Sequence, residues 1–233
     1  MKKIFLFSIF GFLILFFLKT STIQAAKSYL KTTITLPSDS RPHYVAVDNV
    51  RHRVYVASHN DNSLYVIDSL TDSLVATIPL GSRPEGVAVA INSGLIYVSD
   101  IYNHAIWVID GATNSVVKTI SDQSFDFPFT LTIDEIHNRL YIVNSLNHAP
   151  LNGTVSVLDT VTDTVSTVIP IGVQPRGAVV NPLTNRLYVA SARNQPGLMV
   201  FDTTTYNLMS TIDLAISLET VALDEVLNRI YVA

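Results

Sequence analysis

The chain has 233 residues, of which 48% are hydrophobic and 15% charged, so it can build a sizeable packed core and is not a mainly disordered chain. It contains no cysteine, which excludes disulfides, thiolate metal ligands and a cysteine nucleophile. The formal net charge is −4 and there is no run of Lys or Arg, so we expect no nucleic-acid partner.

Residues 1–26 have the layout of a secretory signal peptide. Lys2 and Lys3 precede an apolar run from Ile4 to Leu18, and the segment ends in Ala25 and Ala26. As a helix this run spans only about 22 Å, short of the ~30 Å hydrocarbon core of a bilayer. We therefore expect a cleaved signal helix and a secreted, periplasmic or cell-surface protein with no membrane span in the mature chain. The alternative is an uncleaved membrane anchor.

Removal of the signal segment makes the protein more acidic. It takes away three lysines and lowers the formal net charge from −4 to −7. Residues 27–40 then form a lead-in, in which the stretch from Leu30 to Leu36 predicts one lone outer strand of a blade.

From residue 41 onward the sequence repeats itself at spacings of 42 to 47 residues. Four segments open alike, and a fifth opens without the proline: Arg41-Pro42-His43, Arg83-Pro84-Glu85, Phe127-Pro128-Phe129, Gln174-Pro175-Arg176 and Ser217-Leu218-Glu219. Each full repeat holds four short runs rich in Val, Ile, Tyr and Thr, parted by turn residues, which is typical of antiparallel strands. Four strands per repeat of this length predict the blade of a β-propeller.

The predicted domain is therefore all-β, with four full blades and a partial fifth. Their bounds are residues 41–82, 83–126, 127–173, 174–216 and 217–233. Because the fifth repeat stops inside its second strand, we expect the sequence to be a fragment of a larger ring of about seven blades.

The second strand of each repeat carries a family resemblance. The strings VYVAS at 54–58, IYVSD at 96–100, LYIVN at 140–144 and LYVAS at 187–191 resemble the YVTN family of β-propeller repeats, as do the stretches 66–81 and 108–120. The resemblance implies a multi-bladed and often extracellular propeller. It implies no single activity.

Two sets of repeated acidic residues favour structural roles. Asp48–Arg53, Asp134–Arg139 and Asp224–Arg229 each span the first turn of a repeat, where a hairpin places them opposite each other. Asp68, Asp110, Asp159 and Asp202 each end a third strand, where a carboxylate accepts hydrogen bonds from the amides of the following turn.

Function is expected where the copies differ, on loops of one face around the channel mouth. The loop before the first strand and the loop between the second and third strands lie on the same face of a four-stranded blade. The candidate ligand-binding residues on these loops are His43, Arg83, Glu85, His104, His148 and Arg176. His59 lies in the corresponding loop of the first blade, so three such loops carry a histidine. Because adjacent blades diverge, we expect these histidines to make separate contacts to solvent or a partner and not to share a metal ion. No resident metal or cofactor is predicted.

Three functions remain open at this stage. The favoured one is a binding module whose loop face holds a protein, a glycan or a cell-envelope component. The second is a propeller enzyme of lactonase or metal-assisted lyase type. The sequence has no catalytic motif that supports it, so it rests only on an analogy of fold. The third is a structural surface-layer component. Convergence of His43, Glu85, His104 and His148 on one point would favour the enzyme.

Overall fold

The computed structural model describes residues 32–145, 153–172, 174–191, 197–214 and 217–233, together with two short pieces near the N-terminus. The chain divides into a unit of residues Met1–Thr33 and a unit of residues Ile34–Ala233. In the first unit, β1 (Ser8–Ile9) and β2 (Phe12–Leu13) pair as antiparallel strands. The expected signal helix and its cleavage site otherwise lie outside the described residues, so the structure gives no support for that helix. Nowhere in the described parts is there a helix with the length and apolar character needed to span a membrane.

The second unit is built from antiparallel sheets whose strand order follows the chain. The first sheet holds β3 (Pro42–Asp48), β4 (Arg53–Ser58), β5 (Ser63–Asp68) and β6 (Ser73–Pro79). The second holds β7 (Pro84–Ala90), β8 (Leu95–Asp100), β9 (Ala105–Asp110) and β10 (Ser115–Ser121). The third holds β11 (Pro128–Asp134), β12 (Arg139–Asn144), β13 (Thr154–Asp159) and β14 (Thr164–Pro170).

The fourth sheet holds β15 (Pro175–Asn181), β16 (Arg186–Ser191), β17 (Gly197–Asp202) and β18 (Leu208–Asp213). A two-stranded fifth sheet holds β19 (Val221–Asp224) and β20 (Arg229–Val232). No helix occurs among the described residues of this unit. The prediction of an all-β chain with four-stranded antiparallel blades is therefore confirmed.

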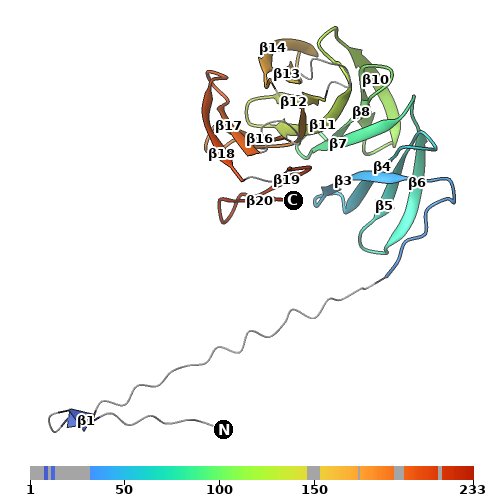
Figure 1. The fold of residues 1–233 in the computed structure, drawn as a ribbon. Helices are drawn as coiled ribbons and strands as arrows, with labels where there is room; N and C mark the ends of the chain where they lie inside the picture. Colours follow the sequence, from blue (N-terminus) through green and yellow to red (C-terminus); the bar gives the residue numbers. More distant parts are fainter. Residues whose placement is uncertain are drawn as a thin grey trace. The chain divides into compact units, whose positions relative to one another are not determined.

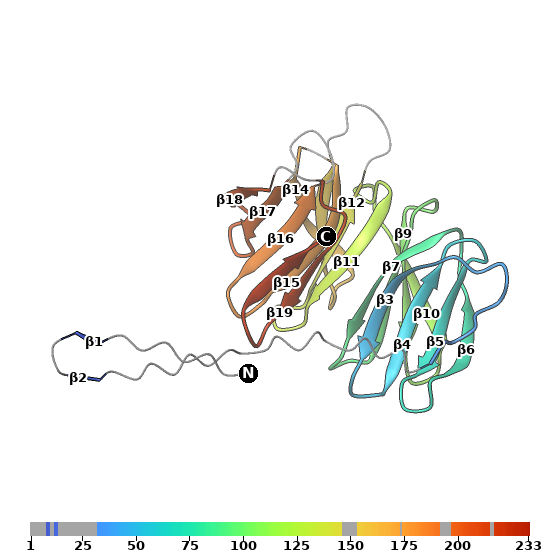
Figure 2. The ribbon, with the colours of Figure 1, turned by 60° about the horizontal axis from the view of Figure 1, so that its bottom comes forward.

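The sheets stand around a common centre and pack face to face with their neighbours (Figure 1). The first strands of successive sheets, β3, β7, β11, β15 and β19, contact one another in turn and are the innermost strands. Four apolar clusters are each shared by two adjacent blades: one of them joins Tyr97 and Ile106 of the second blade to Leu140 and Leu158 of the third. Figure 2 shows the strands of each blade running alongside one another with turns at both ends. This is the radial arrangement of a β-propeller.

The first turn of each blade ends in a left-handed residue just before the second strand. These residues are His52, Gly94, Asn138, Asn185 and Asn228, all with φ between 49° and 74°. Glycine and asparagine tolerate this conformation better than other residues do. The turn therefore follows from the sequence in four blades, and His52 is the exception.

The aspartates that end the third strands behave as predicted. Asp159 Oδ1 accepts hydrogen bonds from the amides of Val161 and Thr162, at 2.8 and 2.9 Å. Asp68, Asp110 and Asp202 make the same pair of bonds in their own blades.

The aspartate–arginine pairs of the first turns are only half confirmed. Asp48 and Arg53 are opposite each other in the strand register. Their side chains go elsewhere, however: Asp48 pairs with Arg51 at 3.0 Å, while Arg53 pairs with Asp68 on the third strand at 2.6 Å. The Asp48 carboxylate is held in its own turn because it also accepts bonds from two turn amides, so it does not reach across the hairpin.

The first blade has one face that no other blade covers in this structure. Val45 and Val47 of β3 are 58% and 50% exposed, whereas Val87 and Val89, at the same positions of β7, are 7% and 8% exposed. The described part of the lead-in, from residue 32, forms no strand. Ile34 and Leu36 within it instead pack against the apolar cluster of Val56, Tyr65 and Ile67.

Candidate functional site

The candidate site lies at one end of the blades, where each first strand begins and each second strand ends. The register pairs Pro42 with Ser58 in the first blade and Pro84 with Asp100 in the second. The loop before a first strand and the loop after a second strand therefore share one face, as the sequence predicted.

A β-bulge occupies the same place in each of these first strands. In β3 the register breaks between Pro42 and Val45, and in β7 it breaks between Pro84 and Val87. His43 and Glu85 are the residues that follow the prolines, so each sits in the bulge of its own blade. Bulges leave residues out of the regular pairing and redirect their side chains. Each of these two side chains therefore leaves its strand at a bulge, and the two are in contact across the blades.

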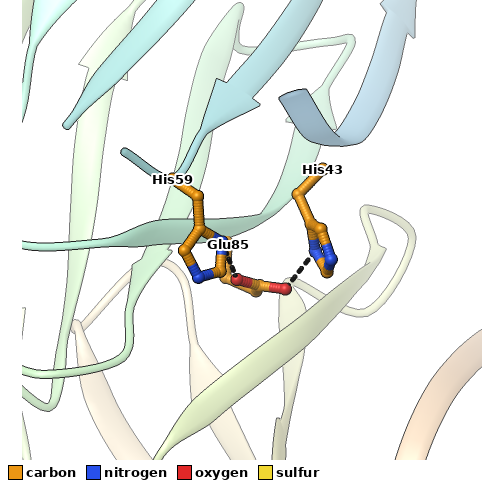
Figure 3. Close-up of side chains that lie close together, drawn as sticks. All are labelled: His43, His59 and Glu85. Atoms are coloured by element: carbon orange, nitrogen blue, oxygen red, sulfur yellow. Dashed lines mark ion pairs between the residues drawn. The ribbon is translucent and has the colours of Figure 1, made fainter. Parts of the chain in front are cut away.

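Three side chains from two blades converge at this point: His43 from β3, His59 from the turn after β4, and Glu85 from β7 (Figure 3). His59 Nδ1 lies 2.8 Å from Glu85 Oε2, and His43 Nδ1 contacts Glu85 Oε1. The two imidazole rings are 5.2 Å apart at their centroids. One potential ligand atom from each residue lies within 4.8 Å of the others.

The Glu85 carboxylate is wholly buried, yet it forms no directed hydrogen bond. Its side chain has no solvent exposure, and neither of its oxygens has a hydrogen-bond partner of acceptable geometry. Its close contacts are two imidazole nitrogens, Nδ1 of His43 and Nδ1 of His59. A buried carboxylate without hydrogen bonds is costly unless a proton or a cation compensates it.

The surroundings shift the ionisation of all three groups. Burial raises the pKa of Glu85 to about 7, although the positive charges of Arg83, Arg176 and Arg41 act in the opposite direction. Burial lowers the pKa of the His59 imidazole to about 4, and the arginines lower it further. The pKa of His43 is lowered for the same reasons. Both imidazoles are therefore neutral near pH 7.

Two arginines lie beside this cluster and rest on aromatic rings. Arg83 Nε donates to His59 Nε2, and the guanidinium lies 5.1 Å from the centre of the Tyr102 ring. Arg176 lies 5.0 Å from the centre of the Phe129 ring. Its Nε is 3.8 Å from a carboxylate oxygen of the exposed Glu219.

Two hollows open on the same face and share Arg83 and Tyr102. The first, of about 340 Å³, is lined by Arg41, His59, Asn60, Asn62, Ser82, Arg83 and Tyr102. The second, of about 220 Å³, is lined by Arg83, Ile101, Tyr102, Phe127, Phe129, Ser145, Gln174 and Arg176. Each hollow has room for a few side chains and not for a large ligand.

The structure brings together four of the six residues selected from the sequence. His43 and Glu85 meet directly, and Arg83 and Arg176 line the adjoining hollows. His104 is elsewhere: its Nδ1 lies 2.9 Å from the carbonyl oxygen of Phe125, and its ring packs on Phe127. His148 lies outside the described residues.

The sequence pattern did not place His59 in the central cluster. His59 matches the histidines of the sibling loops in position, but its neighbours in the structure are His43 and Glu85 of two first strands. The signal was available in the register, since His59 directly follows Ser58, the partner of Pro42. The strand pairing brings His59 beside His43, and blade packing adds Glu85.

Comparison with known proteins supports the fold and leaves the activity open. Residues 82–109, in the second blade, match the family model of the NHL repeat, which is a β-propeller repeat type. This match covers well under half of the chain, and the YVTN resemblance stays a prediction. No curated protein matches the chain.

Among solved structures, the chain resembles hydrazine synthase of Kuenenia stuttgartiensis with a TM-score of 0.71 and 17% identity. The match covers 84% of this chain and 56% of that one, so the chain spans a little over half the length of its structural match. In total 1394 solved chains match. A fold shared so widely, at such low identity, establishes the propeller architecture and nothing about its chemistry.

Proposed function

We propose that this protein is an exported β-propeller scaffold that binds an acidic segment of a protein ligand at the face carrying Arg83 and Arg176. The observation that carries the proposal is the pair of adjoining hollows, in which each arginine lies on an aromatic ring. The propeller supplies a rigid frame, and the loops at one end supply the contacts.

The chemistry of this face favours a carboxylate partner. The guanidinium group forms a planar fork that matches a carboxylate with two parallel hydrogen bonds. Arginine and aromatic residues are also enriched among the residues that dominate binding energy in protein interfaces. Tyr102, Phe127 and Phe129 supply apolar walls for the residues beside an acidic side chain.

Export is part of the proposal and rests on the sequence alone. The basic start and apolar run of residues 1–26 support a secretory signal. The ligand is accordingly expected in the periplasm, at the cell surface or outside the cell.

The test is a peptide selection on the purified full chain. We expect random displayed peptides that bind to be enriched in Asp or Glu next to aromatic or aliphatic residues. Binding of a selected peptide, measured by fluorescence anisotropy, should weaken at least about tenfold in R83A and in R176A, since loss of a charged hydrogen bond costs about 1.5–3 kcal/mol. The control is R229A, because Arg229 starts a second strand at the opposite end of its blade.

The charge-preserving variant R176K should lose part of the affinity, because lysine keeps the charge and lacks the planar fork. Urea midpoints close to that of the wild type would show that the variants are folded. Peptides without acidic enrichment, or equal binding to the wild type and to folded R83A and R176A, would refute the proposal.

A second candidate function is an enzyme, and one observation favours it: a buried carboxylate lies between two neutral imidazoles beside a solvent-accessible hollow. A carboxyl group with a pKa near 7 is suited to general acid–base chemistry at neutral pH. Hydrolysis of a panel of lactones by the wild type and its loss in E85Q would support this function. Equal rates in the two proteins would exclude it.

A further inference from the structure

We propose that His43, His59 and Glu85 form a binding site for a divalent transition-metal ion, with zinc(II) as the expected occupant. This proposal stands apart from the binding of an acidic protein segment, since the donors are different side chains. The sequence spacing of these residues predicted no such site, and it becomes visible only when two blades pack together.

The donor set is the first argument. Two imidazoles and one carboxylate are a set that zinc(II) accepts, and three protein donors leave a fourth position for water or a ligand. Magnesium and calcium prefer sites made of oxygen donors, so imidazole nitrogens select against them. The three ligand atoms already lie within 4.8 Å of one another.

The second argument is independent and concerns Glu85 alone. This carboxylate is fully buried between the imidazoles, and neither oxygen has a hydrogen-bond partner of acceptable geometry. The other buried acids that the structure describes are satisfied: Asp48 accepts from two turn amides, Asp134 from the amide of His137, and Asp100 from two amides and the Trp107 indole. Among the described residues, Glu85 is the buried carboxylate that lacks such bonds on both oxygens, and a cation between the three groups would compensate it.

The distance between the two buried donors, His59 and Glu85, requires only a small adjustment. Zinc bonds to nitrogen and oxygen of about 2.0–2.2 Å in a tetrahedral site place two donor atoms roughly 3.4 Å apart. His59 Nδ1 and Glu85 Oε2 are 2.8 Å apart. An outward movement of about half an ångström therefore makes room for the ion. His43 is the most exposed of the three and can adjust most easily, since its side chain is 37% exposed.

One neighbour must move for the ion to bind. Arg83 Nε donates to His59 Nε2, but an imidazole that binds metal through Nδ1 carries its proton on Nε2. Two donors cannot face each other, so Arg83 must turn away toward the hollow it shares with Tyr102. His59 also lines this hollow, which gives a bound ion access to an exogenous ligand at its fourth position.

The test is zinc titration of the full chain, purified without a polyhistidine tag and stripped with a chelator, by isothermal titration calorimetry. We expect one zinc ion per chain. Loss of an outer-sphere partner already costs about 10–100-fold in metal affinity, so H43A, H59A and E85Q should each weaken binding at least that much. The spectrum of cobalt(II) substituted for zinc reports four-coordination without reference to any activity.

A matched control lies in the third blade. His137 Nδ1 is 2.7 Å from the buried Asp134, which repeats the imidazole–carboxylate contact without a second histidine. H137A should leave zinc affinity unchanged. H43A removes an exposed side chain and should not disturb folding, so it remains informative if H59A or E85Q unfolds.

Substitution of Arg83 is the variant expected to preserve or increase zinc affinity. R83Q removes a positive charge and a competing donor, and its amide oxygen can accept the Nε2 proton, so zinc should bind as tightly or more tightly. A wild-type protein that binds no zinc would overturn the proposal. Zinc binding that is unchanged in H43A and E85Q, or weakened equally in H137A, would overturn it as well.

Discussion

The packing of neighbouring blades can be tested by one substitution made at two equivalent positions. Val47 of β3 and Val89 of β7 occupy the same place in their repeats, paired with Val54 and Ile96 respectively. Val47 is 50% exposed, whereas Val89 is 8% exposed because a blade covers its face. Substitution by alanine removes the same atoms from the same strand position, so differences in strand propensity cancel.

The expected magnitudes follow from burial. Valine to alanine removes about two methylene equivalents, each contributing about 0.8 kcal/mol when buried. The incompletely filled cavity adds to this, so V89A should lower the free energy of unfolding by about 1.5–3 kcal/mol. V47A should cost about half of the transfer contribution and leave no enclosed cavity, which gives less than about 1 kcal/mol.

The assay is equilibrium unfolding in urea, followed by far-ultraviolet circular dichroism, with each variant compared at its midpoint and slope. We expect a lower midpoint for V89A at an unchanged slope, and a difference of at least about 0.5 kcal/mol between the variants. Equal costs would refute the reasoning, because Val47 would then have to be as well covered as Val89 in the folded protein.

Three further predictions concern turns and close contacts. H52N should raise the free energy of unfolding by about 0.5–1 kcal/mol in the same urea assay, because asparagine tolerates the left-handed conformation of His52; a destabilised variant would contradict this. G86A should lower it by about 1–3 kcal/mol, since a Cβ at Gly86 would lie 2.3 Å from the backbone oxygen of Phe129; an unchanged midpoint would show that β7 and β11 are not so close. The turn amides lower the pKa of Asp159, so its contribution to stability is present above the unfolded pKa of about 3.9 and is lost as the pH falls through the lower folded value. D159N should therefore show a smaller loss of urea midpoint between pH 5 and pH 2 than the wild type, as acid titration of both proteins would reveal; identical pH profiles would argue against this cap.

The strands and turns of each blade were predictable because they are determined by residues close together in the sequence, and the same pattern recurs in each repeat. The strand runs, the turns between them and the aspartate that ends each third strand are all recognised within about ten residues of chain, and the structure has them where they were expected. The side-chain partners were less predictable. Arg53 pairs with Asp68 because the third strand lies next to the second, a choice that the hairpin spacing alone does not reveal.

The sequence predicted on which face of the blades the site lies, but it did not predict the cluster of His43, His59 and Glu85. Pattern alone placed His43 and Glu85 at matching positions, but it could not show that these two side chains contact each other across neighbouring blades. His59 was missed because its neighbours come from strand pairing and from the next blade. His104, at a loop position like those of its siblings, instead turns to the carbonyl oxygen of Phe125 in its own blade.

The two proposals made for this face are linked through Arg83. In the structure this arginine donates to His59 Nε2, which holds the imidazole in the state that opposes metal binding through Nδ1. An acidic ligand that binds Arg83 would draw the guanidinium away from His59, so that His59 Nδ1 becomes free to bind zinc. Zinc binding would in turn displace the Arg83 guanidinium toward the hollow, where the acidic ligand can bind it. Because coupling free energies between two binding sites are reciprocal, each ligand should increase the affinity for the other by the same factor. In R83Q this mutual increase should vanish, since the side chain that connects the two sites is gone.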